Sequence, residues 1–466
     1  MAAKFGTSGL RGLATELMGA VAVSYTRAFL QHLKRKKQIH KGDEVFVAMD
    51  FRASSAALHA NVGEAIATEG MVMRFFGAVP TQALAFEAMA QKSACVMITG
   101  SHIPADRNGL KFYRPDGEID KRDEKAIVAG VASLKAAKAS ERKSQNGQID
   151  AFEARYRKAF GKAALKGMRV GVYQQSTVAR DLMVALLQSA GAEVTPLGRS
   201  ESFIPVDTEA VSPETLTLLK QWAQGGAFDA IVSADGDGDR PLVADENGQV
   251  LRGDLLGLIT AKYLDAKTVV TPVTSNSGLD TYLRKGTRRT RVGSPYVIAE
   301  LLRAKKARAR GIVGFEANGG FFTASPFKLG RTVLTPLPTR DCFLPILAGL
   351  ASARKAKKSL SVLAASYPLP IALAGRLENF AVEASARLMK RLAGSKAAGE
   401  AFFAPLGKIK SQDVTDGLRV TLADGSIVHL RPSGNAPEFR CYVEAETQTA
   451  AEELLARALK LISAQR

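Results

Sequence analysis

The sequence is poor in cysteine and has no long apolar run, and both absences narrow what the protein can be. Its 466 residues include three cysteines, Cys95, Cys342 and Cys441, which are widely spaced and odd in number. They form neither a disulfide framework nor the paired spacing of a zinc site, as in proteins of a reducing compartment. No apolar run approaches the ~20 residues that cross a bilayer, and the N-terminal segment lacks the apolar core of a secretory signal. We therefore expect a cytoplasmic protein without a membrane partner.

Motifs for reading nucleic acid are also missing, although the chain is basic. Its formal net charge of +19 would suit nucleic acid, an anionic membrane or an anionic small molecule. The basic runs at 34–37 and 303–306 are typical of solvated helix faces. We find no zinc-finger spacing, homeodomain signature or aromatic stacking motif. We therefore expect no nucleic-acid partner, and the charge leaves an anionic substrate open.

Strand and helix patterns alternate in three successive rounds, which predicts parallel βαβ units. Each round ends in a polar, glycine-rich loop, and we interpret the rounds as three related domains. The predicted strands are 45–49, 71–76, 95–98, 168–173, 193–195, 229–232, 268–273, 291–292 and 311–315. The predicted helices are 56–70, 82–91, 178–190, 213–224, 279–285 and 296–308.

The pattern changes after Pro370. Segments 418–422 and 427–430 flank an Ala-Asp-Gly turn and predict a hairpin. A strand at 439–444 and a helix at 450–462 complete a small module. The fold class is thus α/β, with three related mixed-sheet α/β domains and a C-terminal α+β domain. The expected domain ranges are 1–147, 148–252, 253–367 and 368–466.

A polar loop at Thr99–Lys111 follows the apolar strand 95–98. Open α/β sheets place their chemistry at the carboxyl ends of strands, so the hydroxyl, imidazole and ammonium groups of this loop are candidates. The alternative is an ordinary Ser-His-Pro surface turn. We do not expect the Ser101–His102 pair to act as a hydrolase dyad, because neighbours in extended chain point to opposite sides.

The strongest local motif is Asp235-Gly236-Asp237-Gly238-Asp239-Arg240. Glycine lets the backbone curl, so three carboxylates at alternate positions can converge on one hard cation. Three oxygens leave room for a phosphate oxygen and water around Mg²⁺. A solvated Asp-Gly turn is the alternative, but it leaves the repulsion among the carboxylates unrelieved. We therefore predict a magnesium site.

Three further segments are suited to anions or sugars. Residues 431–440 contain two arginines, a hydroxyl, an amide and glycine-freed backbone, which suit a phosphate clamp. Residues 5–12 could cradle an anion beside Arg11, and residues 314–320 offer a carboxylate and an amide to sugar hydroxyls. Each of these segments, taken alone, is also compatible with an ordinary glycine-rich turn or a loop with rim arginines.

Together these segments resemble the α-D-phosphohexomutases, the phosphoglucomutase/phosphomannomutase family. FGTSGLRG, TGSHIPADRNGLK, DGDGDR and RPSGNAPEFR occur in the family's order, in a match that runs from Phe5 to Glu444. The resemblance implies four domains around a central cleft. It also implies an isomerase that interconverts hexose 1-phosphate and hexose 6-phosphate through a phosphoserine and a 1,6-bisphosphate, acting on mannose and also glucose phosphates.

The resemblance also implies a role for each site residue. The residues that would hold Mg²⁺ are the phosphorylated Ser101, Asp235, Asp237 and Asp239. Those that would bind the substrate are Glu316 and Asn318 at the sugar hydroxyls, and Arg431, Ser433, Asn435 and Arg440 at the non-reacting phosphate. Those that would line the transferring phosphoryl group are Arg11, His102 and Lys111. The implied partners are hexose phosphates, with hexose 1,6-bisphosphate as activator, and the chain would be a monomer or dimer.

The sequence departs from the family pattern in three loops. Gly100 and Ile103 stand where the serine loop usually has Ala and Asn, and Asn435 replaces Thr in the phosphate loop. The sugar loop commonly ends in Ser-Gly-His, whereas here it ends in Asn318-Gly319-Gly320. The general base therefore stays open among Lys111, His102 and Arg11. These departures motivate a second hypothesis, a catalytically weak paralogue that binds sugar phosphates. A third, a phosphoglucosamine mutase, is less favoured, because those sequences more often carry DGDADR and GTDGIRG.

Overall fold

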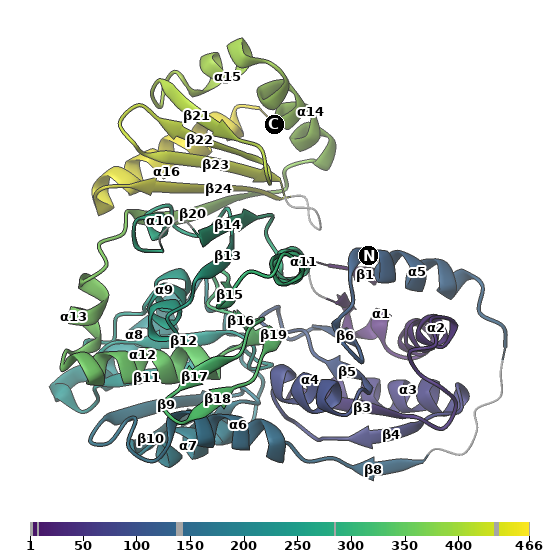
Figure 1. The fold of residues 1–466 in the computed structure, drawn as a ribbon. Helices are drawn as coiled ribbons and strands as arrows, with labels where there is room; N and C mark the ends of the chain where they lie inside the picture. The colour runs from purple at the N-terminus through teal and green to yellow at the C-terminus, as the bar shows by residue number, and fades with distance from the viewer. Residues whose placement is uncertain (1–2, 7–8, 137–142, 284–285, 433–437, 466) are drawn as a thin grey trace. The chain divides into compact units, whose positions relative to one another are not determined.

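The computed structural model divides into two compact units, each described here by itself (Figure 1). The first unit comprises residues 1–269 and 293–366, and the second comprises residues 270–292 and 367–466. The residues that the structure describes are 3–6, 9–136, 143–283, 286–432 and 438–465. Within these ranges, none of the helices combines the length and apolar content that spanning a bilayer requires.

The first unit begins with a mixed sheet of order β1-β2-β6-β5-β3-β4-β8, with β7 paired to β6. Its centre is parallel, since β3 (Glu44–Met49) pairs in the same direction with β4 (Val72–Phe75) and β5 (Ala94–Ile98). β6 (Arg107–Arg114) turns back antiparallel to β5, so the loop between them lies at the carboxyl end of β5. The other strands of this sheet are β1 (Lys4–Phe5), β2 (Leu10–Leu13), β7 (Gly117–Glu118) and β8 (Ser144–Asn146).

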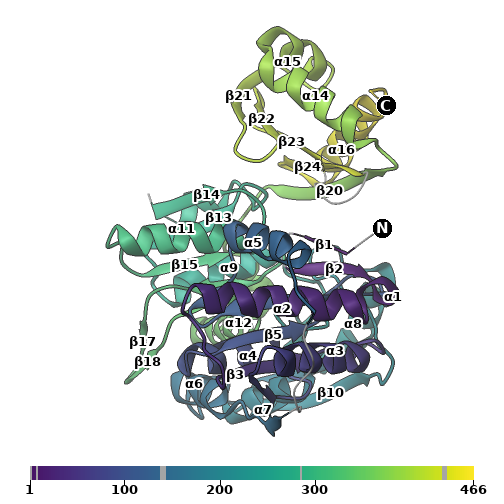
Figure 2. The same cartoon turned by 90° about the vertical axis from the view of Figure 1, so that its right-hand side faces the viewer.

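Helices cover both faces of this sheet, because successive side chains of a strand point to opposite sides. Val45 and Val47 of β3 belong to one apolar cluster with α2, α3 and α5, which lie side by side in Figure 2. Phe46 and Ala48 belong to a second cluster with α4. The helices are α1 (Ala14–Leu17), α2 (Ala20–Arg35), α3 (Ser55–Thr68), α4 (Thr81–Ala90) and α5 (Lys121–Ala132). β5 is therefore buried along its whole length and firmly anchors the loop that follows it.

A second sheet in the same unit has the order β10-β9-β11-β12. β9 (Arg169–Gln175) pairs in parallel with β10 (Glu193–Arg199) and β11 (Ala230–Ala234), whereas β12 (Pro241–Ala244) is antiparallel to β11. The aspartate-rich segment 235–240 therefore joins β11 to β12. The helices of this region are α6 (Asp150–Phe160), α7 (Arg180–Ser189), α8 (Pro213–Ala223) and the 3₁₀ turn η1 (Gln224–Gly226).

A third set of strands completes the first unit. β15 (Ile312–Phe315), β16 (Phe321–Thr323) and β19 (Leu337–Asp341) form an antiparallel ladder, and residues 316–320 join β15 to β16. The remaining elements are α9 (Gly253–Tyr263), α11 (Ser294–Lys306), β17 (Phe327–Leu329), β18 (Thr332–Leu334), α12 (Phe343–Ala356) and α13 (Leu360–Ala365).

The second unit is built on a five-stranded antiparallel sheet of order β20-β24-β23-β22-β21. The predicted hairpin is confirmed as β22 (Leu418–Leu422) and β23 (Ile427–Pro432), and Asp424 accepts hydrogen bonds from both the backbone N–H and the hydroxyl of Ser426 in its turn. The other elements are β20 (Ile371–Glu378), α14 (Val382–Gly394), α15 (Lys396–Phe403), β21 (Ile409–Asp413), β24 (Glu438–Ala445) and α16 (Gln448–Ser463). The predicted fold class, mixed-sheet α/β domains followed by an α+β module, is confirmed.

One predicted strand is wrong. β13 (Thr268–Pro272) and α10 (Leu279–Tyr282) begin where the sequence indicates, but the strand expected at 291–292 is β14 (Thr287–Thr290) instead. The backbone N–H of Val292 donates at 2.9 Å to Asp416 Oδ2, which is distant in sequence, and so does not pair with a neighbouring strand. The end of the helix predicted at 279–285 includes residues 284–285, which lie outside the described residues.

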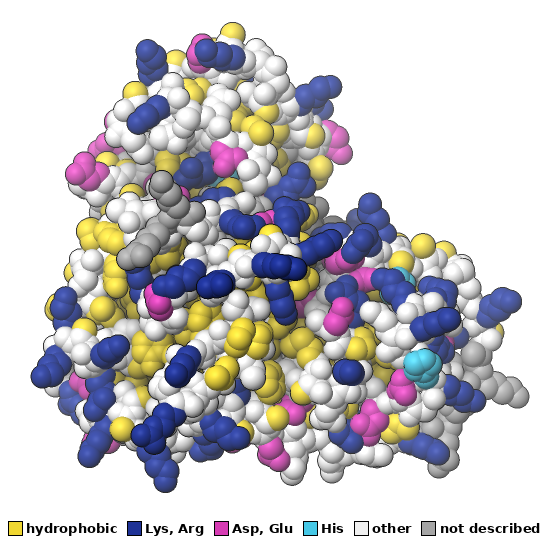
Figure 3. Space-filling model, in the orientation of Figure 1, with side chains coloured by type: hydrophobic (Ala, Val, Ile, Leu, Met, Phe, Trp, Pro, Cys, Tyr) yellow, Lys and Arg dark blue, Asp and Glu magenta, His cyan; other side chains and the backbone are white. Residues whose placement is uncertain are grey.

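The basic runs lie at helix ends rather than along the helix faces that the sequence indicated. Lys34 and Arg35 occupy the last turn of α2, and Arg303, Lys305 and Lys306 the last turn of α11. Cations at a helix C-terminus interact favourably with the helix dipole. Figure 3 shows Lys and Arg side chains scattered over much of the face that it draws.

His429 of β23 is a buried histidine in the second unit, with 2% of its surface exposed. Its Nε2–H donates to the backbone carbonyl of Asp416 at 2.6 Å. Burial lowers the pKa of His429 to about 4, helped by Arg419 and Arg431 and opposed by Asp416. The ordinary value is about 6.5, so between these two pH values the unfolded chain binds more protons than the folded chain. The stability therefore rises with pH in this window and falls as the pH is lowered through it.

We predict that replacing His429 by Gln removes part of this acid sensitivity, because the amide keeps a donor and does not titrate. Relative to His429→Gln, the wild type should lose about 3 kcal/mol of unfolding free energy as the pH falls from about 6.5 to about 4. Urea denaturation across this range measures the difference. His40→Gln is the matched control, since that side chain is 73% exposed. Parallel pH profiles for wild type and His429→Gln would contradict the assignment.

Candidate active site

Three buried aspartates follow β11 at its carboxyl end. Asp235, Asp237 and Asp239 each offer a carboxylate oxygen within 4.8 Å of the others, and all three are nearly inaccessible to solvent. Gly238 lies in the left-handed region with φ of 71°, and a Cβ there would come within 3.0 Å of Ala179. The alternating glycines thus let the chain turn tightly enough to bring the carboxylates together.

Lys111 of β6 and Ser101 reach this triad from the first sheet. Lys111 Nζ donates to Asp237 Oδ2 and to Asp239 Oδ2, both at 2.5 Å. Ser101 Oγ donates to Asp235 Oδ2 at 2.6 Å. The structure therefore brings together the serine, the lysine and the three carboxylates that the sequence singles out.

The triad fits a divalent cation. Asp237 Oδ1 and Asp239 Oδ1 are buried and, among the described residues, have no hydrogen-bond partner, so two hard oxygen atoms stay available. Burial and the two neighbouring carboxylates raise the pKa of Asp235 well above its usual range. Burial acts in the same direction on Asp237, but Lys111 and Thr81 outweigh it and lower the pKa of Asp237. Mg²⁺ prefers such oxygen ligands and often shares them with a substrate phosphate.

Ser101 has a strained backbone. Its φ is +56°, a conformation that costs a non-glycine residue energy and persists where the surroundings enforce it. The enforcing contact is local, since the Ser101 N–H donates to Thr99 Oγ1 at 2.7 Å, and Thr99 Oγ1 donates to Asp50 Oδ2 at 2.8 Å. Strain of this kind is concentrated at functional sites.

The expectation that Ser101 and His102 point to opposite sides is wrong. Ser101 Oγ and His102 Nδ1 lie 3.2 Å apart. The reason is the left-handed φ of Ser101, because the argument from opposite directions applies only to extended chain. His102 is therefore a direct neighbour of the hydroxyl. Burial and the surrounding cations Arg240, Arg11, Arg340 and Lys111 lower its pKa well below the usual value.

Arg52, which the sequence did not single out, holds the serine loop in place. It follows β3 and is 3% exposed, and its Nε donates to Asp50 Oδ2 at 3.1 Å. Its two Nη atoms donate to four backbone carbonyls of the loop, at 2.6 to 2.9 Å. These carbonyls belong to Ser101, Ile103, Pro104 and Arg107. One guanidinium thus determines the path of the loop on both sides of His102.

The position of Arg52 also explains why residue 100 is a glycine. A Cβ at position 100 would lie 2.7 Å from Arg52 Cζ, so a side chain there and this guanidinium compete for the same space. The guanidinium is 4.0 Å from the ring centre of Phe203, and a Cβ on Gly236 would lie 2.9 Å from that ring. Phe203 therefore packs between Arg52, which holds the serine loop, and the aspartate-rich segment 235–240. Nothing in the structure explains the Ile103 side chain.

Three arginines gather near Lys111 and the triad. Arg240 Nε is buried without a hydrogen-bond partner among the described residues, and it lies 3.7 Å from Asp239 and 3.9 Å from Asp235. Burial, with repulsion from Arg240 and Arg340, lowers the pKa of Arg11 to about 10. Cations held close together with few acceptors form a site for a multiply charged anion.

The loop of residues 316–320, between β15 and β16, lies near the aspartate triad. Glu316 is 3% exposed and accepts a hydrogen bond from Arg340 Nε at 2.5 Å, and Arg340 Nη1 lies 3.9 Å from Asp239. Asn318 shapes the loop, since its Oδ1 accepts the N–H of Gly320 at 3.0 Å. Glu316 is thereby linked to the triad through Arg340, which the sequence did not single out.

The predicted phosphate clamp belongs to the second unit. Arg431 and Arg440 are register partners on β23 and β24, and Arg376 of β20 is the register partner of Arg440 on its other side. Like charges directly opposite each other destabilise a sheet, and carboxylates of the same unit offset them, with Arg376 3.0 Å from Glu378 and Arg440 3.6 Å from Glu438. Arg431 Nε is also bonded to Asp416 at 2.9 Å. Ser433 and Asn435 lie outside the described residues, as do Thr7 and Ser8 of the N-terminal motif.

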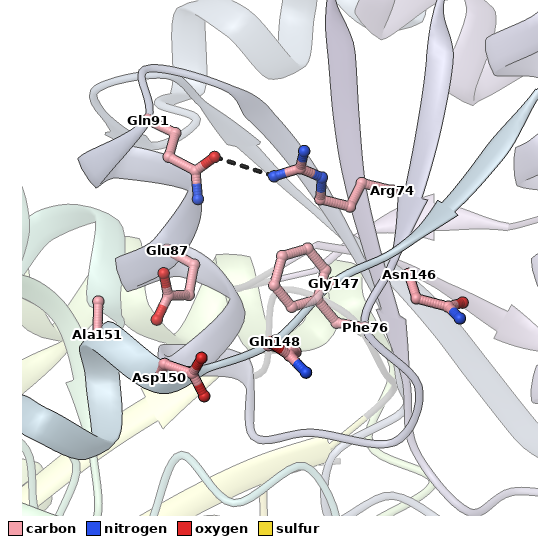
Figure 4. Close-up of a pocket in the computed structure, with 9 residues that line it drawn as sticks. All are labelled: Arg74, Phe76, Glu87, Gln91, Asn146, Gly147, Gln148, Asp150 and Ala151. Atoms are coloured by element: carbon pink, nitrogen blue, oxygen red, sulfur yellow. Dashed lines mark hydrogen bonds between the residues drawn. The ribbon is translucent and has the colours of Figure 1, made fainter.

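A separate cavity of about 570 Å³ lies beside α4 and β8 (Figure 4). None of the predicted site residues lines it. Its buried carboxylate, Glu87, accepts the N–H of Phe152 at 2.9 Å and thereby caps the first turn of α6. Arg74 at its rim donates to Gln91 at 3.1 Å. Glu87 and a terminal nitrogen of Arg74 thus have partners within the protein.

Comparison with known proteins covers nearly the whole chain. Models of the phosphoglucomutase/phosphomannomutase alpha/beta/alpha domains I, II and III match residues 2–138, 149–248 and 252–369, and the model of the C-terminal domain matches residues 377–461. The chain is 50% identical over 470 residues to a phosphomannomutase of Sinorhizobium fredii, with 99% of each chain covered. It is 41% identical over 449 residues to a phosphomannomutase of Salmonella muenchen, covering 95% of this chain and 92% of the relative.

A solved structure shares the fold. The phosphoglucomutase/phosphomannomutase family protein of Burkholderia thailandensis matches with a TM-score of 0.79 at 20% identity, covering 98% of this chain and 97% of that one. The sequence motifs, the buried site and the matches over all four domains lead to one conclusion. This chain belongs to the phosphoglucomutase/phosphomannomutase family.

Proposed function

We propose that this protein is a phosphomannomutase that also accepts glucose phosphates and interconverts the 1-phosphate and 6-phosphate of a hexose. One observation carries the proposal, namely that Ser101 Oγ, on a strained turn, lies 2.6 Å from a carboxylate of the buried triad. A hydroxyl held between carboxylates that fit a metal and a group of cations is arranged for phosphoryl transfer. Such transfer depends mainly on positioning and charge stabilisation.

In the proposed cycle, Ser101 carries a phosphoryl group at the start. The bond between phosphorus and Ser101 Oγ breaks as a bond forms to the free hydroxyl of the hexose monophosphate, whose proton leaves to a base, and Ser101 Oγ takes up a proton. The resulting 1,6-bisphosphate turns end for end. Its other phosphoryl group returns to Ser101 Oγ, whose proton leaves, and the freed sugar oxygen takes up a proton. The base stays open among Lys111, His102 and Arg11.

The chain's own residues supply the charge that this transfer needs. Asp235, Asp237 and Asp239, with the phosphoserine, would hold Mg²⁺, which supplies positive charge to the phosphoryl oxygens when bound. Lys111 brings a buried ammonium group to the same place. Arg11 adds a guanidinium, which binds phosphoryl oxygens through its rigid set of donors.

The remaining predicted residues would bind the rest of the substrate. Glu316 and Asn318 would bind sugar hydroxyls, and Arg431, Ser433, Asn435 and Arg440 would bind the non-reacting phosphate. A clamp that accepts phosphate from either end of the sugar is what an intermediate that turns around requires. Hexose 1,6-bisphosphate would also act as the activator that restores the phosphoserine.

The alternative is a paralogue that binds sugar phosphates and turns them over slowly or not at all. Gly100, Ile103 and Gly320 motivate it. The strained Ser101 and its bond to Asp235 count against it, because a protein that only binds does not need a strained nucleophile beside a buried triad. Activity therefore remains the better-supported proposal.

We predict turnover of mannose 1-phosphate and glucose 1-phosphate, and less of glucosamine 1-phosphate, in parallel assays with Mg²⁺ and a trace of hexose 1,6-bisphosphate. Ser101→Ala removes only the acceptor oxygen. It should abolish turnover while hexose-phosphate binding, measured by calorimetry, stays nearly unchanged. No turnover of any of the three substrates by the wild type would refute the mutase proposal. Near-full activity of Ser101→Ala would refute the phosphoserine assignment.

We further predict that Gly100→Ala lowers kcat/KM by roughly 100-fold, because a Cβ there displaces Arg52 and with it the serine loop. Gly63→Ala is the matched control, since its Cβ would meet Met73 Sδ at an ordinary 3.5 Å. In an Arg52→Lys background, which already lacks the guanidinium, Gly100→Ala should add little. Equal effects of Gly100→Ala in both backgrounds would show that Arg52 does not position Ser101.

A further inference from the structure

Gly320 lies against an arginine of the neighbouring strand. It stands where the family commonly has histidine. A Cβ at position 320 would lie 2.8 Å from Arg340 Cδ and 2.9 Å from its Cγ. Arg340 belongs to β19, which pairs with β16 directly after the sugar loop. A side chain at position 320 would force the present Arg340 side chain to move, so the glycine leaves the space that Arg340 occupies.

Arg340 has more N–H donors than the hydrogen bonds that it makes to the described residues. Its side chain is 4% exposed, and its Nε donates to Glu316 at 2.5 Å. Among the described residues, neither of its Nη atoms donates a hydrogen bond, and Nη1 lies 3.9 Å from Asp239 Oδ2. These Nη atoms are not among the fully buried, unpartnered atoms of the described residues, so they remain accessible to an acceptor that comes from outside the chain.

The charges around Arg340 indicate the nature of that acceptor. Burial alone would lower the pKa of Arg340, but Glu316 and Asp239 outweigh it and keep the guanidinium charged. Arg340 in turn contributes to lowering the pKa of Arg11 and of His102, so it lies close enough for its charge to act on both. An anion with several oxygens, placed among these groups, would relieve the repulsion between them.

We propose that Arg340 is a substrate-binding residue that contacts the phosphoryl group exchanged with Ser101, in place of the histidine that position 320 lacks. The proposal rests on the proposed mutase function and adds a residue to it. Nε positions Glu316 for the sugar, while the Nη atoms take phosphoryl oxygens. Unlike a histidine, this group stays charged and supplies no general base, so the reaction's proton must leave through another residue.

Calorimetric binding of mannose 1-phosphate in a Ser101→Ala background, which forms no phosphoserine, tests the proposal without turnover. Arg340→Met should weaken binding about 10- to 100-fold, the usual effect of losing hydrogen bonds to a charged group. Arg340→Lys should recover only part, because an ammonium cannot bond Glu316 and a phosphoryl group as the planar fork does. Arg303→Met is the control, since that arginine is 75% exposed on α11.

A purely structural role for Arg340 gives a different result. If Arg340 binds substrate, added guanidinium ion should restore binding and turnover to Arg340→Ala, whereas urea should not. Equal affinities of Arg340→Met and Arg303→Met for mannose 1-phosphate would overturn the proposal while leaving the mutase function intact. Failure of the Ser101→Ala parent itself to bind the sugar phosphate would overturn both.

A second pair of variants keeps the test valid if Arg340→Met does not fold. Gly320→Ala should weaken mannose 1-phosphate binding when Arg340 is present, because its Cβ displaces the arginine. In an Arg340→Ala background the same change should have little effect. An additive outcome would mean that position 320 does not act through Arg340, and would overturn the proposed link between Gly320 and Arg340.

Discussion

The site depends on one electrostatic constraint, the burial of three carboxylates within one short turn. Left alone, Asp235, Asp237 and Asp239 would repel each other strongly, because burial weakens the screening by water. Lys111 relieves this repulsion by bonding two of them at 2.5 Å, and Ser101 donates to the third. Neutralising the triad therefore brings the Ser101 hydroxyl and the Lys111 ammonium group from the first sheet to the aspartate loop of the second.

Much of this arrangement could be predicted from the sequence, because the relevant residues lie in loops at the ends of recognisable strands. The apolar strand before Ser101 and the alternating glycines of the aspartate loop indicated both positions, whereas the bonds of Lys111 to the triad came from the structure alone. The domain ranges, the cytoplasmic location and the roles of the site residues remain predictions. The prediction that the Ser101 and His102 side chains point to opposite sides was wrong. A single positive φ, which composition does not reveal, changes the direction of the Ser101 side chain.

The arginines that complete the site could not be found from local pattern alone. Arg52 carried a usable signal, since Asp-Phe-Arg follows a predicted strand that neighbours the strand before Ser101, and neighbouring parallel strands end at one edge. Arg340 carried none, because it lies inside a short strand whose pairing depends on contacts distant in sequence. The unusual glycines at positions 100 and 320 were the only indirect sign of these two arginines in the sequence. Gly100 leaves space that Arg52 fills, and Gly320 leaves space that Arg340 fills.

The central claim is that Ser101 Oγ carries the phosphoryl group between the two ends of the sugar. Peptide mapping by mass spectrometry, after incubation of the wild-type protein with hexose 1,6-bisphosphate and Mg²⁺, tests it most directly. The account predicts a single phosphorylated site at Ser101, which disappears when hexose monophosphate is then added in excess. Phosphorylation at another residue, or a phosphorylated Ser101 that excess hexose monophosphate fails to discharge, would contradict it.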